Sequence, residues 1–306
     1  MCISELNWQS IGITVAGGNG NGIELNQLSG SYGVCVDDNE TVYIADTSNH
    51  RIVQWKKGAT IGKIIAGGND QGYRDNQLHS PSNVILDRET DSLIIADSGN
   101  QRVVRWSRSN CQFDGILISN VACWGLAMDD EGYLYVSDID KHEVRRYRLG
   151  DQIGTIVAGG HGKGKHLDQL NRPYYITVDK KQSVYVSEYS NNRVTKWIKG
   201  ADQGVIVAGS DNRGDGLTQL SYPYGLAVDT FETICIADFN NHRVISWRQE
   251  ATQGSIVVGG NGPGNQANQL TYPVSVAFDS KCNLYVVDFN NQRVQKFLVT
   301  SISNKL

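Results

Sequence analysis

Three histidines and a recurring polar motif are the residues of this 306-residue chain that could do chemistry. His50, His142 and His242 occupy matching places in copies of a repeat, and imidazoles that converge on one point can hold a metal ion. The motif reads acidic residue, two residues, Asn, one residue, Arg, then Val or Ile. A carboxylate beside a guanidinium can be an ion pair or part of an acid–base site. Which chemistry is available depends on the elements that position these side chains.

The motif recurs about every fifty residues. Five complete copies begin at Asp46, Asp97, Glu188, Asp238 and Asp288. A degraded copy begins at Asp138, where Lys141 and Glu143 replace the Asn and the Arg. A fixed period of this length predicts a repeat architecture. A catalytic pair has no reason to recur six times, so we interpret the motif as scaffold.

Each repeat predicts four short antiparallel strands and no helix. Two runs rich in Val, Ile and Tyr precede the motif, a third strand follows it, and a fourth strand comes after a glycine turn. Six such units predict an all-β fold, a six-bladed β-propeller of four-stranded blades. The segment 11–16 is a fourth strand without a blade, and 274–299 supplies a blade without its fourth strand. We therefore expect a single domain, 1–306, closed by pairing these two segments.

The motif and its flanking strands resemble the NHL repeat. Asp-x-x-Asn-x-Arg-Val/Ile ahead of an aromatic strand follows strands such as Gly-Leu-Ala-Val-Asp at 225–229, and the resemblance covers about 11–299. NHL propellers include substrate-binding domains of ubiquitin ligases, RNA-binding domains, extracellular sensor domains of bacterial kinases and the peptide-amidating lyase. The resemblance implies the fold and leaves the function open.

An enzyme of the lyase type would need histidines converging on a metal near the axis. The three histidines lie in loops between second and third strands, roughly 10 Å or more from the axis when strands are about 4.8 Å apart, too far from each other to share a metal. Lactonase-like propellers hold calcium in the channel, and Asn83 is the single candidate at the start of an innermost strand. We expect no catalytic residue, no metal and no cofactor. A metal-dependent hydrolase or lyase is an alternative.

Aromatic residues gather where the innermost strands begin. Four of the six positions just before these strands are aromatic, and more aromatic residues follow the acidic residue of the motif on the same face. Aromatic side chains with a polar tip suit recognition of a partner. We expect this face to bind a protein or peptide through Tyr32, Trp124, Tyr174, Tyr175, Tyr224, Tyr189, Phe239 and Phe289.

The glycine-rich crossovers that link the blades also lie on this face, and one is missing. Between Trp106 and Trp124 the chain is about ten residues short, and the segment from Cys111 to Asn120 leads straight into the next blade. The shortfall predicts a notch beside the second and third blades, which we expect to be a ligand groove.

The net charge excludes a general attraction to nucleic acid or anionic lipid, because the chain has 28 Lys and Arg residues and 32 Asp and Glu residues. No apolar stretch approaches the roughly 20 residues that span a bilayer, so we expect no membrane partner. A local basic patch favours RNA binding as a second alternative, through Lys141, Arg145, Arg146, Lys163, Lys165 and Arg172.

Of the six cysteines only Cys2 and Cys282 could form a disulfide. We expect the propeller to be part of a larger multidomain chain.

Overall fold

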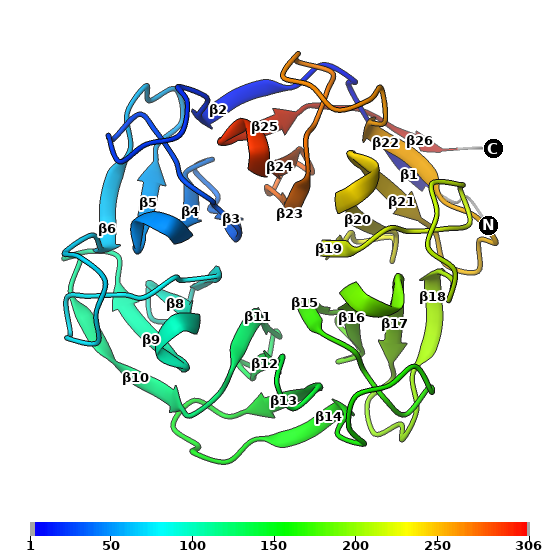
Figure 1. Cartoon of the computed structure of the whole chain (residues 1–306), viewed down its shortest axis with the longest axis horizontal. Helices are drawn as coiled ribbons and strands as arrows, with labels where there is room; N and C mark the ends of the chain where they lie inside the picture. Colours follow the sequence, from blue (N-terminus) through cyan, green and yellow to red (C-terminus); the bar gives the residue numbers. More distant parts are fainter. Residues whose placement is uncertain (1–3, 305–306) are drawn as a thin grey trace.

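The computed structural model describes residues 4–304 and forms a ring of six four-stranded antiparallel sheets around a central channel (Figure 1). The predicted six-bladed propeller is confirmed. Blades 1 and 2 contain β3 (Val34–Val36), β4 (Val42–Asp46), β5 (Arg51–Trp55) and β6 (Lys63–Gly67), then β7 (Asn83–Asp87), β8 (Ser92–Asp97), β9 (Arg102–Ser107) and β10 (Phe113–Ser119). Blades 3 and 4 contain β11 (Cys123–Met128), β12 (Leu134–Asp138), β13 (Glu143–Tyr147) and β14 (Thr155–Gly159), then β15 (Pro173–Val178), β16 (Val184–Glu188), β17 (Arg193–Trp197) and β18 (Val205–Gly209). Blade 5 contains β19 (Pro223–Val228), β20 (Ile234–Asp238), β21 (Arg243–Trp247) and β22 (Ser255–Gly259).

Blade 6 is completed by the N-terminal segment, as predicted. It contains β23 (Pro273–Phe278), β24 (Leu284–Asp288) and β25 (Arg293–Phe297), and its outer strand is β2 (Ile13–Gly17). Ile13 lies opposite Lys296, and Gly17 lies opposite Arg293. This antiparallel pairing closes the ring.

A second pairing near the chain ends was not predicted. β1 (Ser4–Trp8) and β26 (Val299–Asn304) form a separate two-stranded sheet beside the ring (Figure 1). The Trp8 ring stacks on Phe278 with centroids 5.8 Å apart, and its Nε1–H donates to the carbonyl of Cys282 at 2.8 Å. The N-terminal strand is therefore anchored on blade 6 as well as paired.

The core lies between the blades, because each sheet packs its faces against two neighbours. Second strands are buried along their whole length, as in β4 and β20. Each long crossover inserts one fully buried leucine between blades, namely Leu28, Leu78, Leu170, Leu220 and Leu270. Burying an aliphatic side chain of this size contributes about 1.5–3 kcal/mol. The contacts between neighbouring sheets and the buried crossover leucines therefore spread the hydrophobic stabilisation around the ring.

The recurring motif holds each crossover in place, which fits its interpretation as scaffold. In blade 1 the motif forms a 3-10 turn, η1 (Thr47–Asn49), followed by a left-handed residue, His50, with φ of 54°. Arg51 Nε pairs with Asp46 Oδ2 at 2.7 Å, and its Nη1 donates to the carbonyl of Ile23 in the crossover at 2.7 Å. Asn49 donates to both Asp46 and the carbonyl of Gly22. The equivalent turns are η2 (Ser98–Asn100), η3 (Tyr189–Asn191), η4 (Phe239–Asn241) and η5 (Phe289–Asn291).

Blade 3 lacks both the crossover and the residues that hold one. Only residues 120–122 separate β10 from β11. Asp138 Oδ1 here accepts the amides of Asp140 and Lys141 within its own turn, whereas Asp46 Oδ1 accepts the crossover amide of Ser29. Ile118 and Val121, each 4% exposed, belong to the core between blades 2 and 3. The predicted shortfall is present, and apolar side chains fill the interior beneath it.

Within the part of the chain that the structure describes, we find no helix with the length and apolar character needed to traverse a bilayer.

Candidate binding site

The eight predicted aromatic residues form one cluster that closes the channel on the crossover face. The Tyr32 ring lies 5.3 Å from Trp124 and 5.5 Å from Tyr224, between ring centroids. Tyr174 stacks on Tyr224 at 4.8 Å with an interplanar angle of 11°. Tyr175, Tyr189 and Phe239 also contact Tyr224, and Phe289 contacts Tyr32. Five of the six blades therefore contribute a ring to this cluster.

Two of the eight residues are internal and the other six are surface residues. Tyr175 and Tyr224 are only 4% and 6% exposed, and burial raises the pKa of both hydroxyls. The remaining six side chains are partly exposed. We call Tyr175 and Tyr224 the plug, and Tyr32, Trp124, Tyr174, Tyr189, Phe239 and Phe289 the aromatic face. Only the aromatic face can contact a partner without opening the channel.

Glycines let the strands come close enough for the plug to close the axis. A Cβ atom on Gly125 would lie 2.6 Å from the carbonyl oxygen of Tyr174, and one on Gly225 would lie 2.5 Å from the Cα of Ser275. Contacts this short do not occur between real atoms, so any larger residue would push neighbouring blades apart. These glycines alternate around the axis with Tyr175 and Ser275, which occupy the space left between them.

Two further aromatic residues extend the face, and the sequence reasoning missed them. Tyr222 stacks on Tyr189 at 4.7 Å, and Tyr272 lies 4.7 Å from Phe239. Both have left-handed backbones, with φ of 54° and 57°, and precede a proline. The Tyr-Pro pairs at the crossover ends were the signal that could have revealed them.

Blade 2 contributes no ring to the mouth and has serines at the matching positions. Ser82 and Ser98 Oγ atoms lie 2.6 Å apart, and Ser98 also donates to the carbonyl of Cys123. Thr47 donates to the carbonyl of Pro81. Blade 2, next to the missing crossover, is therefore the blade without a ring at the mouth, and its Ser82 is fully buried.

The six predicted basic residues divide into separate groups. Lys141, Lys163, Lys165 and Arg172 are exposed on the crossover face. Arg145 and Arg146 are neighbours on β13, so their side chains point to opposite faces of that sheet. Arg145 pairs with Glu143 at 2.6 Å, and Arg146 lies over the Tyr133 ring at 4.6 Å. Four cations, rather than six, are therefore exposed on the crossover face.

The three histidines are occupied as hydrogen-bond acceptors between blades. Their Nδ1 atoms accept the backbone amides of Ser80, Arg172 and Tyr272 at 3.0, 3.2 and 3.1 Å. Each amide belongs to the crossover that enters the next blade. Burial lowers the pKa of all three rings, which favours the neutral form that can accept. The geometry supports a structural role.

Among residues 4–304, no three His, Cys, Asp or Glu side chains are grouped so that they could hold a metal ion. The proposed pairing of Cys2 with Cys282 involves Cys2, which lies outside the described residues. The lactonase candidate Asn83 is buried inside the channel, where its Oδ1 accepts the amide of Val84 at 2.7 Å.

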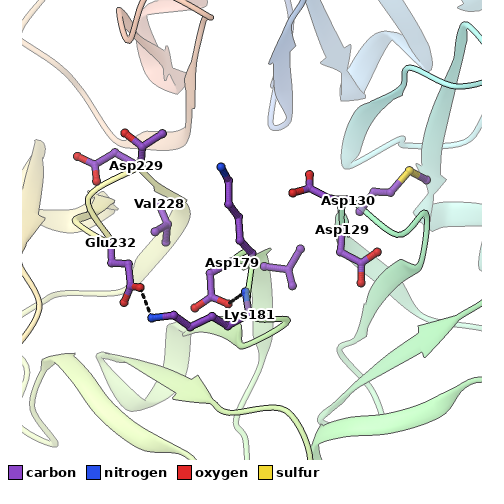
Figure 2. A pocket seen from close by; sticks show the side chains of 11 residues that line it. Asp129, Asp130, Asp179, Lys181, Val228, Asp229 and Glu232 are labelled. Carbon is purple, nitrogen blue, oxygen red and sulfur yellow. Dashed lines mark hydrogen bonds and ion pairs between the residues drawn. The ribbon is translucent and has the colours of Figure 1, made fainter.

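A second concave site lies at the other end of the channel and was not predicted. A cavity of about 390 Å³ lies at the first turns of blades 3 to 5. Asp129, Asp179 and Asp229 line it (Figure 2). These carboxylates organise the turns, as when Asp179 Oδ1 accepts the amides of Lys181 and Ser183. Lys181 also pairs with Glu232 at 2.6 Å, linking two blades. The sequence signal was the Asp at each such turn.

The turn of blade 5 differs from its neighbours in one contact. Tyr135 and Tyr185 donate to the second oxygens of Asp129 and Asp179, but Cys235 occupies the matching position in blade 5. Asp229 Oδ2 is consequently buried without a partner among the described residues, and burial raises the pKa of this carboxyl. The residue is therefore a local weak point in the turn.

Comparison with known proteins agrees with the repeat geometry. The NHL repeat family matches residues 33–55 and 270–297, which lie in blades 1 and 6. The chain is an NHL-repeat propeller. No curated protein matches this chain.

Several solved structures share the fold of this NHL propeller at low identity. A protein of unknown function from Bacteroides thetaiotaomicron aligns with a TM-score of 0.76 and 16% identity, over 97% of this chain and 77% of that one. An auxiliary nutrient binding protein from the same organism has a TM-score of 0.73, 14% identity and the same coverage. A gluconolactonase from Xanthomonas campestris has a TM-score of 0.66 and 12% identity, over 90% and 87%. Binding proteins and an enzyme thus share the NHL propeller's fold, which alone assigns neither activity.

Proposed function

We propose that this propeller is a non-enzymatic binding module that recognises a protein or peptide on its crossover face. The observation that carries the proposal is the convergence of six partly exposed rings from five blades at the crossover end of the channel. Large aromatic side chains held in a rigid cluster bury much area at little entropic cost, which is why they dominate binding energy at interfaces.

The surroundings of the aromatic face favour an extended partner over a small globular ligand. Only residues 120–122 connect β10 to β11, so no long crossover borders the aromatic face between blades 2 and 3. Exposed cations flank the opposite end, at Lys163, Lys165 and Arg172. One structural neighbour is described as a nutrient binding protein, so this fold has a binding use elsewhere.

The proposal is tested by selecting from a displayed library of random peptides with the purified propeller. We expect enriched sequences to bind the wild type and to lose at least tenfold in affinity to the double variant Trp124→Ala, Tyr174→Ala. A Lys180→Ala variant changes an exposed residue at the opposite mouth and is the matched control, expected to bind as the wild type does. Peptides that bind the double variant equally well, with both variants folded by thermal melting, would contradict the proposal.

A further inference from the structure

The channel beneath the plug is a cavity lined mainly by apolar side chains, and it opens toward the face of Figure 2. All six innermost strands line it, and its volume is about 280 Å³. Its walls include Ile85, Leu126, Ala127, Ala227 and Ala277. It shares Met128 and Val178 with the cavity of Figure 2, so the two spaces meet. The plug closes the other end.

An unpartnered polar side chain lies at the closed end. Asn83 is 5% exposed and lines the channel. Its Oδ1 accepts the amide of its own neighbour Val84, but its Nδ2 has no hydrogen-bond partner anywhere in residues 4–304. Asn83 lines the channel, so a ligand oxygen at this end would replace water as the acceptor of the Nδ2 hydrogen bonds, and one such bond contributes about 0.5–1.5 kcal/mol.

Two hydroxyls stand beside this amide. Ser275 is 2% exposed and lines the same space as Tyr175. The Tyr175 hydroxyl donates to the carbonyl of Ser82 at 3.5 Å. The closed end therefore offers N–H and O–H donors in an apolar tube.

The lining of the channel contains no Asp, Glu, Lys, Arg or His among the described residues. A charged group buried there would lack a counter-charge, which is costly. An apolar chain that ends in a neutral oxygen would match both the walls and the donors.

We propose that the channel binds a slender neutral amphiphile, with its oxygen at Asn83 and its hydrocarbon chain directed toward the mouth of Figure 2. The ligand enters from the face opposite the aromatic face, so this site is independent of the proposed partner.

Straight-chain alkanols from n-butanol to n-octanol are the probes, with binding measured by calorimetry on the whole chain. We expect affinity to rise roughly fourfold for each added methylene, as burial of hydrocarbon predicts, and n-octane to bind at least tenfold more weakly than n-octanol. A flat response along the series, or equal binding of n-octane, would overturn the proposal.

Two kinds of variant locate the site. Asn83→Ala removes both N–H donors without adding a charge, and should weaken n-octanol binding about tenfold. Ala227→Leu and Ala277→Leu each place a larger side chain on the wall and should abolish binding, so that one serves if the other fails to fold. Lys56→Ala, in the exposed turn between β5 and β6, is the control. Unchanged binding in a folded wall variant, or a crystal soaked in n-octanol that shows only water in the channel, would overturn the assignment.

Discussion

Individual side chains of the repeated motif link separate elements of the fold. Removing one of them should therefore destabilise more than its own loop. In blade 5, Arg243 pairs with Asp238 at 2.8 Å and donates to three crossover carbonyls. Its side chain is 5% exposed. A buried guanidinium with this many partners fixes the crossover and the loop as one unit.

We predict that Arg243→Ala lowers the free energy of unfolding by about 3–5 kcal/mol, because it leaves the buried Asp238 carboxylate without its counter-charge. Urea unfolding measures the loss. Lys141→Ala is the control, since this lysine in the degraded copy is 57% exposed and pairs with Asp138 at 3.5 Å. Its removal should cost less than about 1 kcal/mol. Equal losses of unfolding free energy in the two variants would refute the distinction between the complete copies of the motif, which act as scaffold, and the degraded copy at the surface.

The accepting histidines predict a dependence of stability on pH. Burial lowers the pKa of His50, His142 and His242 in the folded chain, so the unfolded chain takes up protons first as the pH falls through about 6.5. The free energy of unfolding should therefore decrease from about pH 7 downward until the folded pKa values are passed.

Substituting all three histidines with Asn should reduce this dependence, because an amide oxygen can accept the same bond. Asn192 does so in blade 4, where its Oδ1 accepts the amide of Tyr222 at 3.1 Å. Urea unfolding of both proteins at pH 7.5 and 5.5 decides the matter. An unchanged slope in the triple variant would show that other groups cause the dependence.

At the scale of elements, the sequence predicted those features that recur from repeat to repeat. The strands, the crossovers, the single missing crossover and the aromatic positions all follow from periodicity and turn residues. The pairing of β1 with β26 could not be predicted this way, because it has no counterpart in the other blades.

Register and depth were also beyond the sequence. Arg145 and Arg146 are close in number, but the alternation of β13 separates them. Tyr174 and Tyr175 are adjacent too, and only the second is buried. Whether a ring reaches the axis depends on the close approach of neighbouring strands at Gly125 and Gly225, a three-dimensional distance.

Glycines at the crossovers should differ sharply in their tolerance of a side chain. Gly67 has φ of +66°, and a Cβ there would lie 2.4 Å from the carbonyl oxygen of His50. Gly20 has φ of +81° and open space around it. We predict that Gly67→Ala costs about 3 kcal/mol or more, whereas Gly20→Ala costs about 1–2 kcal/mol from backbone strain alone. Thermal melts of the two variants give the comparison, and an equal loss would contradict the steric argument.

At the scale of the whole molecule, closure of the ring is reinforced by charge. Glu40 of blade 1 accepts hydrogen bonds from Lys281 at 2.6 Å and Lys296 at 2.7 Å, both in blade 6, and from Lys57 at 2.9 Å. The Glu40 side chain is 8% exposed. The three lysines hold the pKa of Glu40 well below its usual range.

We predict that Glu40→Gln destabilises the protein by about 3 kcal/mol at pH 7, since it leaves the buried Lys296 ammonium without its closest carboxylate. Because the folded pKa is lowered, this contribution is present above about pH 4.3 and is lost as the pH falls further. Arg88→Ala, which removes an exposed pair with Asp38 between blades 1 and 2, is the control and should change stability by less than about 1 kcal/mol. Similar effects of both variants would argue against a special role at the closure.

The pairing of β2 with β25 also constrains how the protein is made. During translation, β2 emerges long before its partner, since about 275 residues separate the two strands. Until β25 leaves the ribosome, the edge of β2 is unpaired. The nascent chain then contains five complete sheets, but the ring cannot close. The final step of biogenesis is thus a single long-range capture, which is slow and exposed to chaperones or to exchange with a second nascent chain.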